Sequence, residues 1–182
     1  MKADTEKLEA VFAQAECIFT LAEVEAALDV IIAQITADFS GKNPLVLGVM
    51  NGALACMGYM LPRLPFLLEM DYVHATRYQG KEEGSDLVWK RRPHVSMQGR
   101  HVILIDDILD RGITLAALQD YCQHAGAASV VIAVLGEKQI ANHQAMVAAD
   151  YVALKIPDRY VFGYGMDYQE YWRNAPGIFA CK

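Results

Sequence analysis

The hydrophobic positions of this chain switch between helical spacing and short continuous runs. A capping box at residues 20–23 (TLAE) lets the Thr20 hydroxyl and the Glu23 carboxylate each satisfy a free backbone N–H. Apolar residues then recur every three or four positions as far as Phe39, and Gly41 provides a stop. This pattern predicts one long amphipathic helix.

Short apolar runs elsewhere predict strands that are buried on both faces. The predicted strands are residues 45–50, 66–75, 102–106, 129–135 and 151–156, and the predicted helices between them are residues 53–61, 114–125 and 141–149. Residues 80–92 are polar and lack periodicity, which indicates a long loop with room for a short hairpin; loops of this length are usually either functional lids or disordered. The uncharged stretch 45–61 is interrupted by glycines and is shorter than the ~20 apolar residues that span a bilayer, so we expect no membrane span.

Alternating strands and helices predict an α/β fold with a parallel sheet and right-handed crossovers. Ligands of such sheets bind beyond the carboxyl ends of the strands. The pair Asn51-Gly52 and the segment 106–114 both follow predicted strands. We therefore expect them at the same edge of the sheet.

Composition narrows the functional classes. At 182 residues the chain has room for one well-buried domain, and its formal charge of −6 with a pI near 5.3 argues against a nucleic-acid partner. The basic run Lys90-Arg91-Arg92 is expected to be solvated loop charge. Four scattered cysteines and a charged N-terminus without a secretory signal suggest reduced thiols in a cytoplasmic protein.

The stretch VILIDDILDRGIT, residues 102–114, carries the strongest chemical signal. A glycine turn that opens a helix presents free backbone N–H groups to an anion such as phosphate, to which Thr114 adds a hydroxyl and Arg111 a cation. The alternative is a plain capping turn. Asp106 and Asp107 cannot share a buried site without compensation, and the candidates are Mg²⁺, a lysine or sugar hydroxyls. In an extended chain these two acids point to opposite sides.

This stretch resembles the phosphoribosyl-pyrophosphate (PRPP) signature of type I phosphoribosyltransferases, and Asp110 within it is typical of the 6-oxopurine branch. Further matches follow in family order at residues 49–53, 76–78, 136–138, 157–168 and Arg173. The resemblance implies a central, mostly parallel sheet flanked by helices, in one domain of residues 1–182. It also implies a small hood, formed from the N-terminal segment and about residues 155–182, and a mobile loop at the active site.

The resemblance also implies roles for individual residues. The 5′-phosphate and ribose would be held by the signature itself: Asp106, Asp107, Asp110, Arg111, Gly112, Ile113 and Thr114. Pyrophosphate would be bound by Asn51, Gly52 and Arg173, and the mobile loop would contribute Arg77 and Tyr78. The purine would be bound by Lys138, Tyr160, Val161 and Asp167. Mg²⁺ would be bound by Asp106, Asp107 and Asp167, since carboxylate oxygens suit a hard cation.

Asp110 and Lys138 receive the chemical roles in this scheme. Asp110 would exchange a proton with N7 of the purine, although capping of the following helix is its alternative role. Lys138 would donate to the exocyclic oxygen of a 6-oxopurine. The implied reaction is transfer of 5-phosphoribosyl from PRPP to hypoxanthine or guanine by a homodimer or homotetramer. The alternatives are a xanthine-guanine enzyme, an RNA-binding regulatory relative and, last, a flavodoxin-like receiver.

Three residues depart from the family pattern. Asn51 stands where a Lys or Arg is usual, Arg111 where a Thr or Ser is usual, and Arg77 where a Ser is usual. A neutral Asn51 removes one cation from the pyrophosphate end, and the two arginines could restore positive charge. By the same resemblance we expect a cis peptide at Asn51-Gly52.

Overall fold

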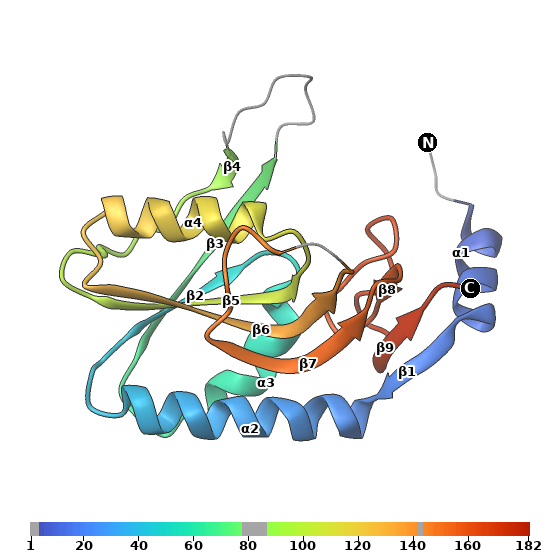
Figure 1. The fold of residues 1–182 in the computed structure, drawn as a ribbon, viewed down its shortest axis with the longest axis horizontal. Helices are drawn as coiled ribbons and strands as arrows, with labels where there is room; N and C mark the ends of the chain where they lie inside the picture. The colour runs from blue at the N-terminus through green and yellow to red at the C-terminus, as the bar shows by residue number, and fades with distance from the viewer. Residues whose placement is uncertain (1–3, 78–86, 142–143) are drawn as a thin grey trace.

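The computed structural model describes residues 4–77, 87–141 and 144–182. A six-stranded sheet in the order β4-β3-β2-β5-β6-β7 forms the centre, and every neighbouring pair is parallel except β3 and β4 (Figure 1). Its strands are β2 (Leu45–Val49), β3 (Glu69–Arg77), β4 (Leu87–Arg91), β5 (His101–Leu109), β6 (Ser129–Gln139) and β7 (Tyr151–Pro157). The predicted α/β class and parallel sheet are confirmed.

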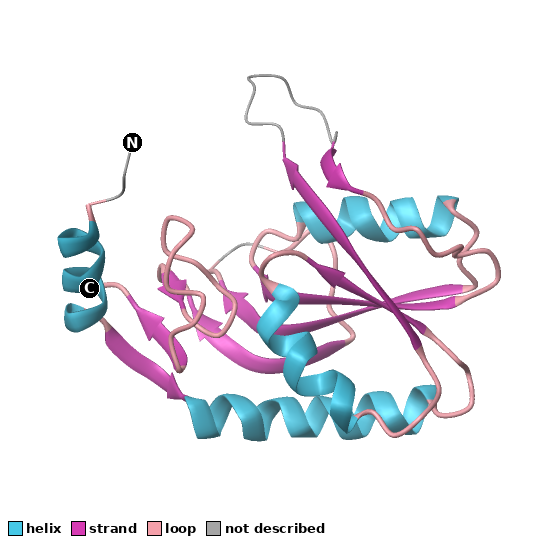
Figure 2. Ribbon diagram, turned by 180° about the vertical axis from the view of Figure 1, so that it is seen from behind, coloured by secondary structure: helices cyan, strands magenta, loops and turns pink. Residues whose placement is uncertain are grey.

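Helices cover both faces of this sheet. They are α2 (Leu21–Phe39) and α3 (Ala53–Met60) on one face and α4 (Ile113–His124) on the other (Figures 1 and 2). The strands divide their side chains accordingly, because alternate residues of a strand point to opposite faces. Ile103 and Ile105 pack with α2 and α3, whereas Val102 and Leu104 pack with α4.

The long helix α2 begins with the predicted capping box. The Thr20 hydroxyl accepts from the Glu23 N–H, and the Glu23 carboxylate accepts from the Thr20 N–H at 2.8 Å. The helix buries a stripe of Val24, Leu28, Ile31, Ile32, Ile35 and Phe39. A short 3₁₀ turn, η1 (Leu61–Arg63), follows α3.

A second, three-stranded sheet stands beside the carboxyl ends of β6 and β7 (Figure 1). Its order is β1-β9-β8, from β1 (Glu16–Thr20), β9 (Gly177–Ala180) and β8 (Val161–Phe162). Helix α1 (Thr5–Gln14) packs on it through Phe12, whose ring lies edge-on to Phe179 of β9 with 5.0 Å between ring centroids. Hence the two ends of the chain meet in this small sheet.

The structure corrects several predicted elements. Residue 141 and residues 144–149 form no helix. The strand predicted at 66–75 begins later, at Glu69, and the loop predicted at 80–92 contains β4, which pairs antiparallel with β3. Strands β5 and β6 run on to Leu109 and Gln139, beyond the predicted ends at 106 and 135. Among the described residues, no helix combines the length and apolar character needed to cross a membrane.

Candidate active site

The carboxyl ends of β2 and β5 meet at the point where the chain order of the sheet reverses. From β2 the chain adds β3 and β4 on one side, and from β5 it adds β6 and β7 on the other. Such a switch point is where open α/β sheets bind ligands. The Asn51-Gly52 turn follows β2, and Asp106 to Asp110 lie at the end of β5, so the structure brings together the segments that the sequence assigned to one edge.

Asp106 and Asp107 lie inside β5 rather than after it, because the strand continues to Leu109. The Asp107 N–H donates to Asp106 Oδ1 at 2.9 Å. As expected for an extended chain, the two carboxylates open into different clefts, one shared by Asp106 with the start of α4 and one shared by Asp107 with Tyr160. Burial, and then the charge of Asp107, raises the pKa of Asp106 well above its ordinary value.

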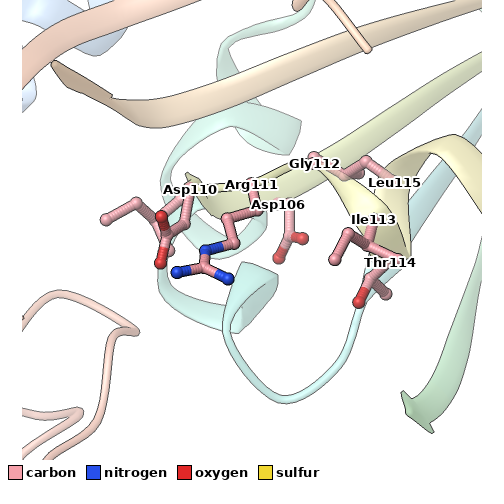
Figure 3. A pocket seen from close by; sticks show the side chains of 8 residues that line it. Asp106, Asp110, Arg111, Gly112, Ile113, Thr114 and Leu115 are labelled. Carbon is pink, nitrogen blue, oxygen red and sulfur yellow. The ribbon is translucent and has the colours of Figure 1, made fainter. Parts of the chain in front are cut away.

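The start of α4 forms a cradle of free backbone donors. Gly112 precedes the helix with φ +73°, and no side chain caps the helix start. Asp110 therefore does not fill the capping role that was its alternative. A cleft of about 410 Å³ opens here, lined by Asp106, Ile108, Asp110, Arg111, Gly112, Ile113, Thr114 and Leu115. In Figure 3 the Arg111 side chain is seen between Asp106 and Asp110 in the lining of this cleft. A cation and a helix N-terminus therefore border one space suited to phosphate.

Asp110 stands where three clefts meet. It borders the cleft at α4, a cleft of about 220 Å³ with Glu137 and Gln139, and a third of about 240 Å³ with Tyr160 and Asp167. Lys138 borders the second and third of these clefts, and its Nζ lies 3.7 Å from Asp110 Oδ2. Lys138 belongs to β6 and does not follow it, contrary to the shorter predicted strand.

The third cleft is the one with aromatic and apolar walls. Tyr160 is 54% exposed and contacts the Tyr168 ring edge-on, with centroids 5.5 Å apart. Val161 and Met166 are buried behind it. This half-open slot has one aromatic face and one cation, Lys138. It suits a planar ring whose edge carries polar groups.

The Asn51-Gly52 turn packs directly on β5. A Cβ on Gly52 would lie 2.1 Å from Asp107 Oδ2, so only glycine allows this approach. The structure contains a cis peptide, as expected, but at Met50-Asn51 rather than at Asn51-Gly52. Asn51 itself is exposed.

Asp167 and Arg173 are joined on the small-sheet side of the site. Arg173 Nη2 lies 2.8 Å from Asp167 Oδ1, and the same nitrogen is 3.3 Å from Glu170 Oε2. Arg173 Nη1 donates to the Gly165 carbonyl at 2.7 Å. Gly165 in turn lies against the Gly52 carbonyl, because a Cβ added to Gly165 would be 2.2 Å from that carbonyl oxygen. This chain of contacts fixes the Asp167 segment against the Asn51-Gly52 turn.

The possible metal donors are spread out rather than clustered. Within the described ranges no three His, Cys, Asp or Glu side chains form a group that could hold a metal ion. Asp106 and Asp107 are nevertheless two half-buried acids whose pKa values burial raises, which suits a divalent cation that takes one or two carboxylates and completes its shell with water and phosphate.

The two residues assigned to the mobile loop, Arg77 and Tyr78, have different outcomes. Arg77 ends β3, whereas Tyr78 lies outside the described residues.

Sequence reasoning missed three residues of the site: Ile108, Met166 and Gly165. The glycine had a signal, the sequence Gly-Tyr-Gly at residues 163–165. Two glycines around one tyrosine indicate backbone that must approach closely or take positive φ, and Gly165 does both, with φ +108°.

Comparison with known proteins identifies this arrangement. The family model described as "Phosphoribosyl transferase domain" matches residues 15–170. The chain is 35% identical over 161 residues to a hypoxanthine-guanine phosphoribosyltransferase of Streptococcus pneumoniae, covering 88% of this chain and 89% of that one. A hypoxanthine phosphoribosyltransferase structure from Staphylococcus aureus superimposes with a TM-score of 0.87 at 28% identity, covering 100% and 97%. A solved hypoxanthine-guanine-xanthine phosphoribosyltransferase gives 0.83 at 28% identity, covering 92% and 96%. The chain belongs to the phosphoribosyl transferase domain family.

Proposed function

We propose that this protein is a hypoxanthine-guanine phosphoribosyltransferase of cytoplasmic purine salvage. It transfers 5-phosphoribosyl from PRPP to N9 of hypoxanthine or guanine, giving IMP or GMP and pyrophosphate. The observation that carries the proposal is the Asp110–Lys138 pair, which lies between a phosphate cradle and an aromatic slot. The identity of 35% to a relative of that name supports it.

In this proposal the PRPP sugar lies along the end of β5. The free N–H groups before α4 and the side chains of Arg111 and Thr114 hold the 5′-phosphate, with Gly112 and Ile113 supplying backbone donors. Asp106 and Asp107 accept hydrogen bonds from the ribose hydroxyls. Because the transition state has oxocarbenium character, most of the catalysis comes from this positioning.

The base occupies the cleft of Tyr160. Tyr160 stacks on the purine face, the backbone of Val161 meets the base edge, and Lys138 donates to the 6-oxo oxygen. Asp110 is the general acid–base group at N7. A base held between Lys138 and Tyr160 also borders Asp110, because all three residues line this cleft.

Pyrophosphate leaves toward the Asn51-Gly52 turn, with Arg173, Arg77 and Tyr78 as further ligands. Asp106 and Asp107 would bind one Mg²⁺ together with PRPP, and Asp167 a second. Bound Mg²⁺ would supply charge neutralisation on the departing pyrophosphate. Asp167 keeps one oxygen on Arg173 and accepts the Glu170 N–H with the other, so a metal there would share this carboxylate with the protein.

A preference for xanthine is the second candidate, because one well-matched solved structure is of an enzyme whose name includes xanthine. The RNA-binding alternative has less support, since Arg91 and Arg92 of the basic run are engaged by neighbouring side chains.

A homodimer or homotetramer remains part of the proposal. All four cysteines are free thiols, in keeping with the proposed cytoplasmic location.

A PRPP-dependent assay with guanine, hypoxanthine, xanthine and adenine, each with and without Mg²⁺, tests this function. The expected result is nucleotide formation from hypoxanthine and guanine only when Mg²⁺ is present. Xanthine as the best substrate would select the second candidate. Adenine as the best substrate would contradict the role of Lys138, because adenine has an amino group in place of the 6-oxo oxygen.

A further inference from the structure

The basic run Lys90-Arg91-Arg92 commits two of its three cations to the protein. Arg91 Nη1 pairs with Asp71 Oδ1 at 2.7 Å, and the Arg92 guanidinium lies 5.2 Å from the centroid of the Trp89 ring. Lys90 is exposed and forms no ion pair within the part of the chain that the structure describes. Lys90 is therefore the member of the run that is available to a ligand.

A β-bulge sets the position of Lys90. In the β3–β4 pair, His74 is opposite Arg91 and the next residue, Ala75, is opposite Trp89, so Lys90 is the extra residue. Bulges of this kind redirect a side chain and are common beside active sites. Here the bulge lies on the pair of strands next to β2, whose end carries the Asn51-Gly52 turn.

Backbone contacts place His74 beside that turn. The Met50 N–H donates to the Val73 carbonyl at 2.8 Å, so the turn lies alongside β3 at the residue before His74. His74 is half-buried. Its imidazole and the neutral Asn51 thus belong to adjacent strand ends at the pyrophosphate side of the proposed site.

The charged groups around His74 come from two sides. Burial lowers the pKa of His74, Lys90 on β4 and Arg173 lower it further, and Glu170 raises it. Within the described ranges, Lys90, Glu170 and Arg173 are thus the charges that act on the imidazole. Arg173 is already shared between Asp167 and Glu170, which leaves it little uncompensated positive charge. Among the side chains that the structure describes at this end, the ammonium of Lys90 is the cation that shares no ion pair.

We propose that His74 and Lys90 bind the pyrophosphate group: Lys90 supplies, beside Arg173, the positive charge that Asn51 lacks, and His74 supplies a hydrogen-bond donor. This inference rests on the proposed phosphoribosyl transfer and deepens it. Pyrophosphate carries several negative charges, and charge-assisted hydrogen bonds are the contacts that hold such a group. Lys90 provides a flexible ammonium, and His74 an N–H donor fixed on a strand.

Calorimetric titration of the full chain with inorganic pyrophosphate, in the presence of Mg²⁺, tests the proposal. Lys90→Gln and His74→Gln should each weaken pyrophosphate binding roughly tenfold. Arg92→Gln is the matched control. It removes the same charge two residues after Lys90, but from a side chain that is already placed over the Trp89 ring. All three variants should bind IMP as the wild type does, which also shows that they are folded.

Relocating the charge makes the test sharper. Asn51→Lys in the Lys90→Gln background should recover most of the lost pyrophosphate affinity, whereas Arg92→Lys in that background should recover none. Equal pyrophosphate binding by the wild type, Lys90→Gln and His74→Gln would overturn this inference and leave the proposed function standing. A wild-type protein that forms no PRPP-dependent product would overturn both.

Discussion

Lys138 Nζ lies 3.7 Å from the carboxylate of Asp110, so a cation on β6 and an acid beyond the end of β5 meet across the cleft. The register of the two strands produces this contact, because Leu109 is opposite Glu137 and the pair is formed by the residues that follow these two, Asp110 and Lys138. Lys138 is the more enclosed partner, with a side chain 16% exposed against 48% for Asp110. The enclosed lysine suits a fixed hydrogen bond to a base, and the open carboxylate suits proton exchange.

Replacement of Asp110 with Asn tests the proton-exchange role. Asn keeps the size of the side chain but cannot take up a proton, so turnover should fall ~10²- to 10⁴-fold, while the KM for PRPP changes little. Steady-state kinetics with hypoxanthine, with PRPP varied, gives both values. Turnover near that of the wild type would show that Asp110 is not the acid–base group.

Replacement of Lys138 with Gln tests recognition of the 6-oxo oxygen. A hydrogen bond to a charged donor contributes ~1.5–3 kcal/mol, so the KM for hypoxanthine and guanine should rise roughly 10- to 100-fold. Lys155→Gln is the control, since Lys155 pairs with Glu137 from β7 and its side chain is 62% exposed. If the two variants had the same KM for the base, Lys138 would have only a general electrostatic effect.

Tyr160 is expected to act through its ring. Tyr160→Phe keeps the face that stacks on the base and should retain base affinity, whereas Tyr160→Ala should weaken it by ~1–3 kcal/mol, the usual range for aromatic stacking on a base. Fluorescence titration with IMP measures the difference. A Phe variant as weak as the Ala variant would assign the effect to the hydroxyl instead of the ring.

Gly52 and Gly58 provide a matched pair at the start and in the middle of α3. A methyl group on Gly52 would collide with the Asp107 carboxylate at 2.1 Å, whereas one on Gly58 meets no atom within 4 Å. Gly52→Ala should therefore reduce kcat/KM severely, since Asp107 or the turn must shift. Gly58→Ala should retain activity and stabilise the fold by up to ~1 kcal/mol, because Ala is the better helix former. Activity assays and thermal unfolding of both variants check this contrast.

Hydrophobic periodicity predicted five strands of the central sheet, all except β4, but did not predict the small sheet. The buried strands and α2 have uninterrupted apolar signals, whereas β8 has two residues and β1 is partly exposed. Strands that short acquire their structure from their partners, here β9 between them and α1 above. Single-sequence patterns do not contain that information.

The helix predicted at residues 141–149 failed for a tertiary reason. The Met146 N–H donates to the Arg111 carbonyl at 3.0 Å, and Val147 lies against Gly112. This segment therefore uses its backbone to support the turn before α4. Its alanine content favoured a helix, but a contact with a distant part of the chain overrode that propensity.

The candidate site was predictable as a set of motifs but not as a geometry. The acids, the glycine turn and Lys138 were all identified from the sequence, yet the Asp110–Lys138 contact depends on how β5 and β6 align. The approach of Gly165 to Gly52 likewise joins segments more than one hundred residues apart. The basic run at residues 90–92 looked uniform, and the bulge in β4 together with the contacts of Arg91 and Arg92 distinguishes Lys90 from its neighbours.

Asp71 should make stability depend on pH. It is 7% exposed and accepts hydrogen bonds from Arg91 at 2.7 Å and from the N–H groups of Tyr72 and His94. Burial acts to raise its pKa, but these hydrogen bonds outweigh burial and hold the pKa below the ordinary 3.8. A lowered folded-state pKa stabilises the fold above the unfolded-state value, and this contribution is lost as pH falls through the folded-state pKa.

Asp71→Asn should therefore lower the free energy of unfolding by about 3 kcal/mol near neutral pH, because Arg91 loses a charged partner that is largely buried. The deficit should shrink as the pH falls below about 4, where protonation removes the same charge from the wild type. Urea unfolding of both proteins across this range measures it. Glu69→Gln is the control, since Glu69 is 49% exposed in its pair with Arg100 and should cost less than about 1 kcal/mol. Wild-type and Asp71→Asn stability curves that stay parallel down to about pH 3 would exclude Asp71 as the group responsible.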